Sequence, residues 1–571
     1  MHRFEVWAPV PRTVELVLED GRVPMERDEA GWWRVEVPTA THGTRYAFAL
    51  DGGPPRPDPR SRHQPDGIDG WSAVVDPGRF PWTDHTWRGL PLAGAVLYEL
   101  HVGTFSPEGT FDGVIERLPH LVDLGIDAIE LLPVAEASGE RGWGYDGVDL
   151  YAPHHAYGGP EGLDRLVDAC HRVGLGVIID VVYNHLGPVG NHLAAFGPYF
   201  TDRHHTPWGE AVNVDQPGSD EVRRFLVDNA LYWLRDHHCD GLRLDAVHAI
   251  RDDSPLHLLE QLAVEVDALS AQLGRTLLVI AENDTNDPRL VRSREAGGYG
   301  LDAAWADEWH HAVHRALTGE VTGYYRDVED PQTLPKALRQ AWVSDGTWSP
   351  TRQRHHGRSP AGLAPRRFVV STQNHDQIGN RARGERLSQL VSEGRLHIAA
   401  ALLLTSPFTP MLFQGEEWGA TSPFQYFTDH HDPALAEAVR VGRRAEFAAF
   451  GWAPEDVPDP QDPATFERSR LVWSEVDAPH HQRLLAWHRH LIRLRRELPA
   501  LTDPRLTVEA TFEAGVLRWR RGPIRLLANL SEAAQEVVVD GEVVAAAPDV
   551  DVVGDRACLP VDSVVIWSTG G

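Results

Sequence analysis

The sequence predicts a multidomain protein with a central (β/α)8 TIM barrel, an N-terminal β-sandwich and a C-terminal antiparallel β domain. Three observations lead to this fold class. The chain has 571 residues, which is too long for one domain of ordinary size. Short apolar strands alternate with amphipathic helices through the middle of the chain, as repeated βα units do. Strand patterns without intervening helices occupy both ends.

The first part, residues 1–90, is expected to form the β-sandwich. Residues 4–10, 14–19 and 32–38 alternate apolar and polar side chains and are separated by Gly, Asp and Pro. A Pro-rich segment at 52–67 follows them, and it predicts a long exposed connection to the next part.

The second part, residues 91–499, carries eight strand candidates, each with a plausible helix after it. These strands are expected at 96–102, 128–134, 177–182, 241–247, 277–282, 301–307, 368–373 and 411–417. One of the helices, at 220–235, places Val222, Phe225 and Trp233 on a single face. Residues 186–218 lack periodicity and are rich in Gly, His and Pro, which predicts an excursion after the third strand.

The third part, residues 500–571, returns to alternating strand patterns and predicts the C-terminal β domain. Its strand-like strings are VLRWRR, IRLLANL, EVVVDG and SVVIWS.

Composition excludes several classes of function. The net charge of −29 makes nucleic acid a poor partner, because both would be negative. Lys336 is the one lysine, so chemistry that needs a lysine has a single candidate. The three cysteines form no CxxC and predict neither a disulfide framework nor a zinc ribbon. With no apolar signal core or membrane span evident, we expect a cytoplasmic protein without membrane partners.

Polar residues end several of the predicted barrel strands. Functional groups of such a barrel lie at the C-terminal ends of its strands, so these side chains are expected to converge on one face. The candidates are Asp180, Asn184 and His185 after the third strand; Arg243, Asp245 and His248 on the fourth; Glu282 after the fifth; and Asn374, His375 and Asp376 after the seventh. Three carboxylates, Asp245, Glu282 and Asp376, therefore meet.

Three converging carboxylates fit the cleavage of a glycosidic bond. A retaining enzyme uses one ionised carboxylate as nucleophile and one protonated carboxylic acid as proton donor, about 5–5.5 Å apart. Arg243 stands two residues before Asp245, on the same strand face, where its charge would keep Asp245 ionised. Glu282 follows LLVIA, and an apolar setting would raise its pKa and suit it as the acid.

Each of these signals alone has an ordinary structural explanation. A single Asp at a strand end most often belongs to a turn or a helix cap. Trp143 and Tyr145 in RGWGYDG are each, taken singly, more typical of a core than of a site. The hypothesis rests on four clusters that occur in the required order on four strands.

Those four clusters, DVVYNH, GLRLDAVH, IAEND and NHD, resemble the conserved regions of the α-amylase superfamily, glycoside hydrolase family 13. IELLPV, VNVD and GEEWG also resemble that family, and FEVWAP is similar to the carbohydrate-binding-module-like N-terminal sandwich of its branching and debranching members. Three longer strings, at 98–111, 141–163 and 373–384, look most like the maltooligosyltrehalose trehalohydrolase family. The resemblance covers essentially the whole chain.

The resemblance implies roles for individual residues. Asp245 would be the nucleophile, Glu282 the general acid and base, and Asp376 the transition-state stabiliser. Tyr145 would stack under the sugar at the cleavage site. The remaining substrate-binding candidates are Trp143, His185, Arg243, His248 and His375.

The resemblance also implies a substrate, maltooligosyl trehalose or a related α-glucan, from which trehalose would be released by hydrolysis. Many family members carry a lysine three residues after the nucleophile, where this chain has His248, and the sugar on the leaving side contacts that position. We expect no cofactor and no required metal, since Asn184 matches a calcium ligand of some amylases but no full acidic set accompanies it.

Two alternatives stay open at this point. One is an α-glucan branching or debranching enzyme with the same three carboxylates. The other is an inactive amylase-fold protein that only binds glucan or a partner; such proteins usually lose one of the carboxylates, and all three are present here.

Overall fold

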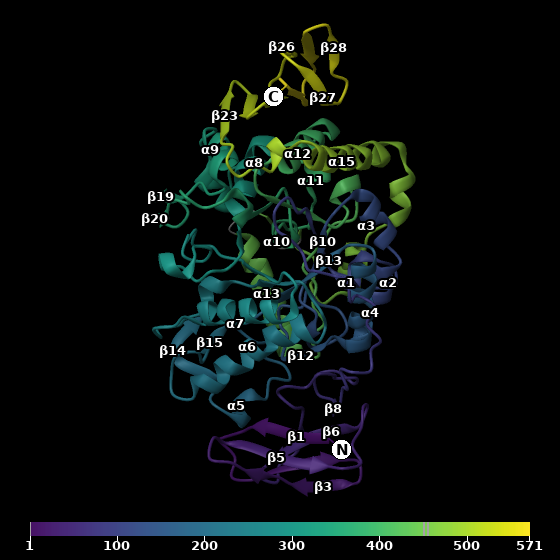
Figure 1. The fold of residues 1–571 in the computed structure, drawn as a ribbon, viewed down its shortest axis with the longest axis vertical. Helices are drawn as coiled ribbons and strands as arrows, with labels where there is room; N and C mark the ends of the chain where they lie inside the picture. The colour runs from purple at the N-terminus through teal and green to yellow at the C-terminus, as the bar shows by residue number, and fades with distance from the viewer. Residues whose placement is uncertain (1, 449–451, 454–455, 571) are drawn as a thin grey trace.

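The N-terminal β-sandwich, the barrel and the C-terminal sheets follow one another along the long axis of the molecule (Figure 1). The computed structural model describes residues 2–448, 452–453 and 456–570. The fold class predicted from the sequence is confirmed, because eight parallel strands close into a barrel between two separate groups of antiparallel strands.

The barrel strands are short and buried throughout, as parallel strands covered on both faces are. In spatial order the closed sheet runs β10-β13-β16-β17-β18-β21-β22-β9. These strands are β9 (Leu97–Leu100), β10 (Ala128–Leu131), β13 (Gly176–Val181), β16 (Gly241–Leu244), β17 (Leu278–Ala281), β18 (Ala303–Trp305), β21 (Phe368–Ser371) and β22 (Thr409–Phe413). Six of the eight lie within the segments predicted from the sequence, while β13 begins one residue and β22 two residues before its predicted segment.

The N-terminal part packs two antiparallel sheets against each other at one end of the molecule (Figure 1). The first sheet contains β1 (His2–Trp7), β5 (Trp32–Val37) and β4 (Glu26–Arg27). The second contains β3 (Gly21–Pro24), β2 (Val14–Leu18), β6 (Arg45–Leu50), β7 (Pro55–Arg56) and β8 (Ser72–Ala73).

Helices follow most of the barrel strands, as the βα pattern predicted. They include α2 (Phe111–Ile115), α3 (Leu118–Leu124), α4 (Gly159–Arg172), α6 (Ser219–Arg235), α7 (Leu258–Leu273), α8 (Asp307–Thr318), α9 (Thr333–Gln340), α12 (Glu393–Thr405), α13 (Pro433–Ala448) and α15 (Pro479–Glu497). Helix α6 buries Val222, Phe225 and Trp233, the face that their spacing predicted. Each large apolar side chain fully buried this way contributes about 1.5–3 kcal/mol to stability.

The connection between β17 and β18 differs from the prediction that every strand is followed by a helix. Residues 282–302, all described by the structure, contain only the short 3₁₀ turn η3 (Arg294–Ala296). The cause is local: Pro288 and the left-handed Gly297 and Gly300 interrupt any continuous helical stretch.

The excursion after β13 forms a small unit of its own. It contains α5 (Leu193–Phe196) and an antiparallel hairpin of β14 (Phe200–Thr206) and β15 (Gly209–Val212). A second hairpin, β19 (Asp345–Ser349) and β20 (Arg354–Gly357), projects from the connection between β18 and β21. A third short pair, β11 (Ala135–Glu136) and β12 (Asp149–Pro153), follows β10.

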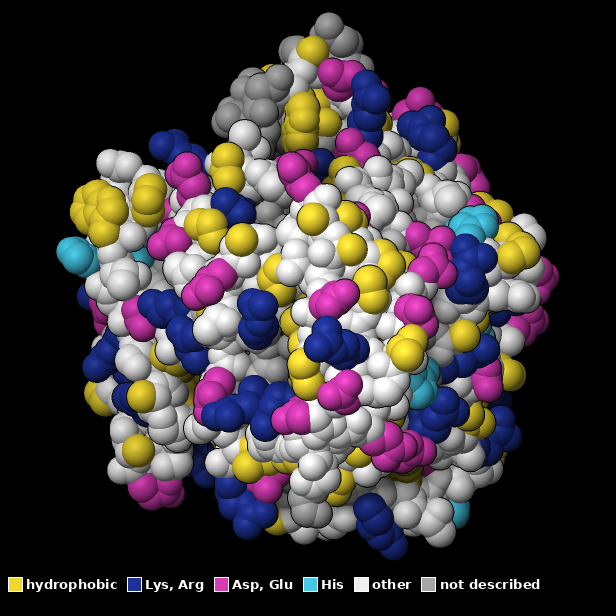
Figure 2. Space-filling model, turned by 90° about the horizontal axis from the view of Figure 1, so that it is seen from above, with side chains coloured by type: hydrophobic (Ala, Val, Ile, Leu, Met, Phe, Trp, Pro, Cys, Tyr) yellow, Lys and Arg dark blue, Asp and Glu magenta, His cyan; other side chains and the backbone are white. Residues whose placement is uncertain are grey.

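The C-terminal part consists of two antiparallel sheets at the other end of the molecule. They contain β23 (Val508–Glu513), β24 (Val516–Arg521), β25 (Ile524–Asn529), β26 (Gln535–Val538), β27 (Glu542–Ala547), β28 (Asp551–Val553), β29 (Arg556–Leu559) and β30 (Ser563–Ser568). Figure 2 shows that basic and acidic side chains are interspersed on the face seen from this end, without a continuous basic stripe. Among the described helices, none combines the length and the apolar character needed to cross a membrane.

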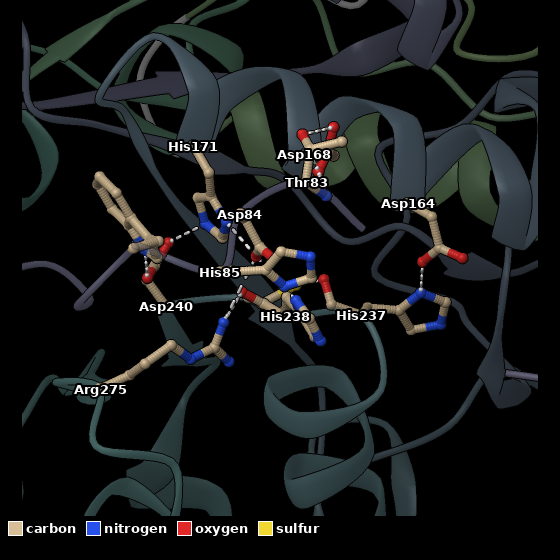
Figure 3. A network of polar contacts seen from close by, with 12 residues as sticks. Thr83, Asp84, His85, Asp164, Asp168, His171, His237, His238, Asp240 and Arg275 are labelled. Atoms are coloured by element: carbon tan, nitrogen blue, oxygen red, sulfur yellow. Dashed lines mark hydrogen bonds and ion pairs between the residues drawn. The ribbon is translucent and has the colours of Figure 1, made fainter. Parts of the chain in front are cut away.

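A buried network of charges holds the linker between β8 and β9 against the end of α4 and the start of β16 (Figure 3). His171 at the end of α4 donates one ring N–H to Asp84 of the linker and the other to Asp240 before β16, both over 2.9 Å. His238 adds a contact of 2.8 Å to the same Asp84 carboxylate. Burial alone would lower the pKa of His171, but hydrogen bonds to Asp240 and Asp84 raise it, so the ring is stabilised as the cation.

We therefore expect Asp84→Asn to lower the free energy of unfolding by about 3 kcal/mol, because it leaves the buried His171 cation with Asp240 as its one remaining carboxylate partner. Urea denaturation followed by near-ultraviolet circular dichroism measures the change. Asp123→Asn is the matched control, since Asp123 pairs with Arg489 at the surface and such pairs contribute at most about 1 kcal/mol. Equal shifts for the two variants would contradict the assignment.

Candidate active site

Arg243 is the centre of the polar cluster at the C-terminal ends of the barrel strands. Its guanidinium is inaccessible to solvent and contacts three carboxylates that come from three neighbouring strands. Nη1 lies 2.6 Å from Asp180 Oδ2 and 3.0 Å from Asp245 Oδ1, and Nη2 lies 3.1 Å from Glu282 Oε2. The guanidinium also lies over the Trp305 ring, with Cζ 4.3 Å from the ring centroid. The buried Arg243 guanidinium thus contacts two of the predicted catalytic carboxylates, Asp245 and Glu282, at the same time.

Asp245 follows β16 and is fixed from both sides. Oδ1 accepts the hydrogen bond from Arg243 that the spacing of the two residues predicted. Oδ2 accepts a hydrogen bond of 2.7 Å from Asn184 Nδ2, which also donates to the Asp245 carbonyl. The two contacts hold both carboxylate oxygens of Asp245 in place.

Glu282 follows β17, and its surroundings differ from the apolar setting expected from LLVIA. Oε2 accepts a hydrogen bond of 2.6 Å from the backbone N–H of Ala246 and pairs with Arg243. Ala246 makes that amide available by adopting a left-handed conformation with φ of 39° directly after Asp245. The expectation was wrong because the apolar residues lie along the strand, whereas the carboxylate is surrounded by groups from the neighbouring strand β16.

Asp376 is the most accessible of the three carboxylates, with 42% of its side chain exposed. It belongs to the short helix α10 (His375–Gly379) after β21, which Asn374 caps by accepting hydrogen bonds from the amides of Asp376 and Gln377. Asp376 Oδ2 lies 3.5 Å from His375 Nε2.

Tyr145 joins the Asp376 side of the cluster to the Arg243 side. Its hydroxyl lies 2.7 Å from His375 Nε2 and 2.7 Å from Asp180 Oδ2, and its ring stacks on His375 with centroids 5.2 Å apart. His185 donates from Nε2 to the Tyr145 carbonyl over 2.9 Å. The structure therefore brings together Tyr145, His185 and His375 with the carboxylates, as predicted.

Within the described residues, neither Trp143 nor His248 has a hydrogen bond or ion pair to the three carboxylates. Trp143 is 5% exposed and stacks on Phe424 in a small apolar cluster. It therefore packs inside the protein behind the site and does not present an exposed ring to a sugar. His248 accepts a hydrogen bond from the Asp284 amide and lines a side pocket of about 320 Å³, together with Arg251, Thr285 and Tyr299.

Several polar or aromatic residues around the site were not assigned a role from the sequence. Burial raises the pKa of Asp180 to about 7, although the charge of Arg243 acts in the opposite direction. The pKa of Asp307 is raised to about 8 by burial and by the charges of Glu282 and Asp376. Trp208, at the tip of the β14–β15 hairpin, is 53% exposed and stacks on His185 with centroids 4.3 Å apart. The sequence signal that could have identified Asp307 as a site residue is its position just after the sixth strand. The sequence carries no comparable signal for Trp208, because its segment shows no periodicity.

The possible metal-ligand groups found among the described residues include none of the three carboxylates. One group contains Glu136, His154 and His155, and another contains His204, Asp215 and Asp253. Both already contain ion pairs, since His155 Nδ1 lies 2.8 Å from Glu136 and His204 Nε2 lies 3.0 Å from Asp215. Asn184, the residue that matches a calcium ligand elsewhere, is engaged with Asp245 and His185.

Comparison with known proteins identifies related sequences along the whole chain. Residues 65–196 match the model of the alpha amylase catalytic domain, and residues 1–77 match carbohydrate-binding module 48, the isoamylase N-terminal domain. The malto-oligosyltrehalose trehalohydrolase of Arthrobacter ramosus is 56% identical, over 92% of this chain and 92% of that protein. The malto-oligosyltrehalose trehalohydrolase of Mycobacterium tuberculosis is 49% identical, over 96% of this chain and 95% of that protein. A glucan branching enzyme of Xanthomonas euvesicatoria is 29% identical over 77% of this chain and 61% of its own.

Solved structures agree with this relationship. A Salmonella typhimurium protein assigned to the alpha amylases superposes with a TM-score of 0.91 at 39% identity, covering 99% of this chain and 97% of that one. A pullulanase of Paenibacillus barengoltzii, at 22% identity and a TM-score of 0.72 over 100% of this chain and 94% of its own, shares the fold. The identity and coverage show that this chain belongs to the malto-oligosyltrehalose trehalohydrolase family, whose catalytic domain is of the alpha amylase type.

Proposed function

We propose that this protein hydrolyses the α-1,4-glucosidic bond next to the terminal trehalose unit of maltooligosyl trehalose and releases trehalose. The observation that supports this function best is the pairing of one buried guanidinium, Arg243, with both Asp245 and Glu282 at the mouth of an amylase-type barrel. The substrate follows from the relatives, whose names specify malto-oligosyltrehalose and whose sequences cover nearly the whole chain.

In the first step, Asp245 attacks the anomeric carbon of the sugar on the non-leaving side, while Glu282 transfers its proton to the glycosidic oxygen. Trehalose departs with that proton, and the glucan remains bound to Asp245 as an ester. Contacts with Arg243 and Asn184 support this role, because they orient the Asp245 carboxylate before substrate binds.

In the second step, Glu282 removes a proton from water, and the water oxygen attacks the same anomeric carbon. The ester bond to Asp245 breaks, the glucan is released with its α configuration retained, and Glu282 has regained its proton. Asp376, the exposed carboxylate, stabilises the positive charge that develops on the sugar ring in both steps.

The sugar-binding roles are assigned in the same way. Tyr145 provides a ring at the floor of the cleft, while His185, Arg243 and His375 orient the sugar and the groups around it. Trp208, stacked on His185 and exposed at a hairpin tip, extends this surface. His248 and its pocket lie on the side of Glu282, the proton donor, and are proposed to receive the leaving trehalose unit. Trp143 supports the cleft from within the protein.

The products of maltotriosyl trehalose test this function. We expect proton NMR to show trehalose together with maltotriose that is initially the α anomer, because two displacements at one carbon retain its configuration. A β anomer at the earliest times, before mutarotation, would exclude the two-step route through Asp245. The same geometry requires the two carboxyl groups to lie about 5–5.5 Å apart, a separation that a complex with a substrate analogue would measure.

A further inference from the structure

Two buried glutamates lie side by side on the first two barrel strands, and neither has a role in the steps above. Glu99 of β9 and Glu130 of β10 are directly paired in the parallel register, and they are 2% and 1% exposed. A carboxyl group inside a barrel is costly unless it is paired or neutral, since apolar branched side chains normally fill that space. The two residues therefore need an explanation.

Only Glu99 contacts the site. Its carboxylate accepts two hydrogen bonds from His375: one from the backbone N–H to Oε2 over 3.0 Å and one from ring Nδ1 to Oε1 over 2.5 Å. These two bonds fix both the start of helix α10 and the plane of the His375 ring. Glu130 has no such contact, and within the described residues its Oε2 has no hydrogen-bond partner.

Burial and the charge of Glu99 act on Glu130 in the same direction. Both raise the pKa of Glu130 well above its ordinary value, which favours its neutral form. Burial would lower the pKa of His375, but the charges of Asp376 and Glu99 and the hydrogen bond to Glu99 raise it to about 9. His375 is therefore an imidazolium with protons on both ring nitrogens.

A second proton on His375 gives direction to a chain of hydrogen bonds. Nε2–H donates to the Tyr145 hydroxyl, which leaves the Tyr145 O–H free to donate to Asp180 over 2.7 Å. Asp180 accepts in turn from Arg243, which holds Asp245. If His375 were neutral, Glu99 would keep the remaining proton on Nδ1, and Tyr145 would donate to Nε2 and no longer to Asp180.

We propose that Glu99 is a positioning residue for the reaction: through His375, Tyr145 and Asp180 it sets the direction of the hydrogen bonds that orient Arg243 and the nucleophile Asp245. This inference rests on the proposed function. Any pH effect on His375 must take into account the charged and titratable groups around it. These groups are Glu99, His101, Glu130, Tyr145, Asp180, Arg243 and Asp376.

The pair offers its own matched control, because Glu99→Gln and Glu130→Gln make the same isosteric change on adjacent strands. We expect Glu99→Gln to lower kcat/KM by roughly 10²-fold at the optimum. Its basic limb should also move to lower pH, because a buried His375 without Glu99 loses its proton earlier. Glu130 makes no hydrogen bond to His375, and burial favours its neutral form, so kcat/KM of Glu130→Gln should stay within about twofold of the wild type, with an unchanged pH profile.

Equal pH profiles for the two variants, or a loss with Glu99→Gln at every pH without movement of the basic limb, would overturn the proposal. If Glu99→Gln does not fold, the wild-type enzyme provides the test through ¹⁵N NMR of labelled histidine, with the His375 signals assigned by comparison with His375→Asn. Both His375 ring nitrogens should be protonated at pH 8, and a neutral His375 ring at that pH would overturn the proposal. The profiles are measured on whichever glucan the wild type cleaves fastest. A wrong substrate assignment then changes the wild-type products but leaves the contrast between Glu99 and Glu130 intact.

Discussion

Asp245→Asn is expected to lower kcat by about 10⁴-fold or more, because the amide cannot form the glycosyl ester on which both chemical steps depend. Asn184 can still contact residue 245, and Arg243 retains Asp180 and Glu282 as partners, so the variant should fold. Steady-state hydrolysis of maltooligosyl trehalose measures the effect, with near-ultraviolet circular dichroism as the check on folding.

Activity within about tenfold of the wild type would remove Asp245 from its role, since an amide cannot replace a nucleophilic carboxylate. Asp123→Asn, the same change at a surface carboxylate on α3, supplies the control and should leave kcat unchanged.

Glu282→Gln has the second largest expected effect, a fall in kcat of about 10³-fold on maltooligosyl trehalose. The reason is the loss of the proton donor, which matters most when the departing group is a sugar alkoxide that must be protonated as it leaves. With an α-maltosyl fluoride, whose fluoride ion departs without a proton, the first step should be nearly as fast as in the wild type. Pre-steady-state release of fluoride measures that step.

A burst of fluoride followed by slow turnover is the expected pattern, since Glu282 is still required to activate water in the second step. An equal loss of the fluoride burst and of maltooligosyl trehalose cleavage would show that Glu282 acts on something other than the leaving group.

The parts of the site that the sequence predicted depend on strand geometry. Asp245 and Glu282 follow their strands directly, so a barrel must bring them to one face, and Arg243, two residues earlier, must point the same way as Asp245. The setting of Glu282 could not be predicted, because Arg243 and the Ala246 amide reach it from the neighbouring strand.

The role of Glu99 could not be predicted for a related reason. Glu99 does not end its strand but stands inside β9, between Tyr98 and Leu100. Its partner His375 is distant in sequence and is brought to it only by closure of the barrel.

The fold itself was more accessible from the sequence than the site. Eight apolar runs of the length of buried parallel strands predicted the barrel, because such strands read as continuous apolar segments. The exceptions were decided by local chemistry and packing: Pro288 and the left-handed glycines removed a helix after β17, and packing against Phe424 buried Trp143.

The substrate assignment is tested by giving the wild-type enzyme maltotriosyl trehalose and maltopentaose side by side. The two substrates contain equal numbers of glucose units. We expect trehalose to be the main small product of the first, and the linear glucan to be cleaved far more slowly, because its end carries no trehalose unit for the leaving side. Equal cleavage of the two, glucose or maltose as the main small product, or new branched chains would contradict the account.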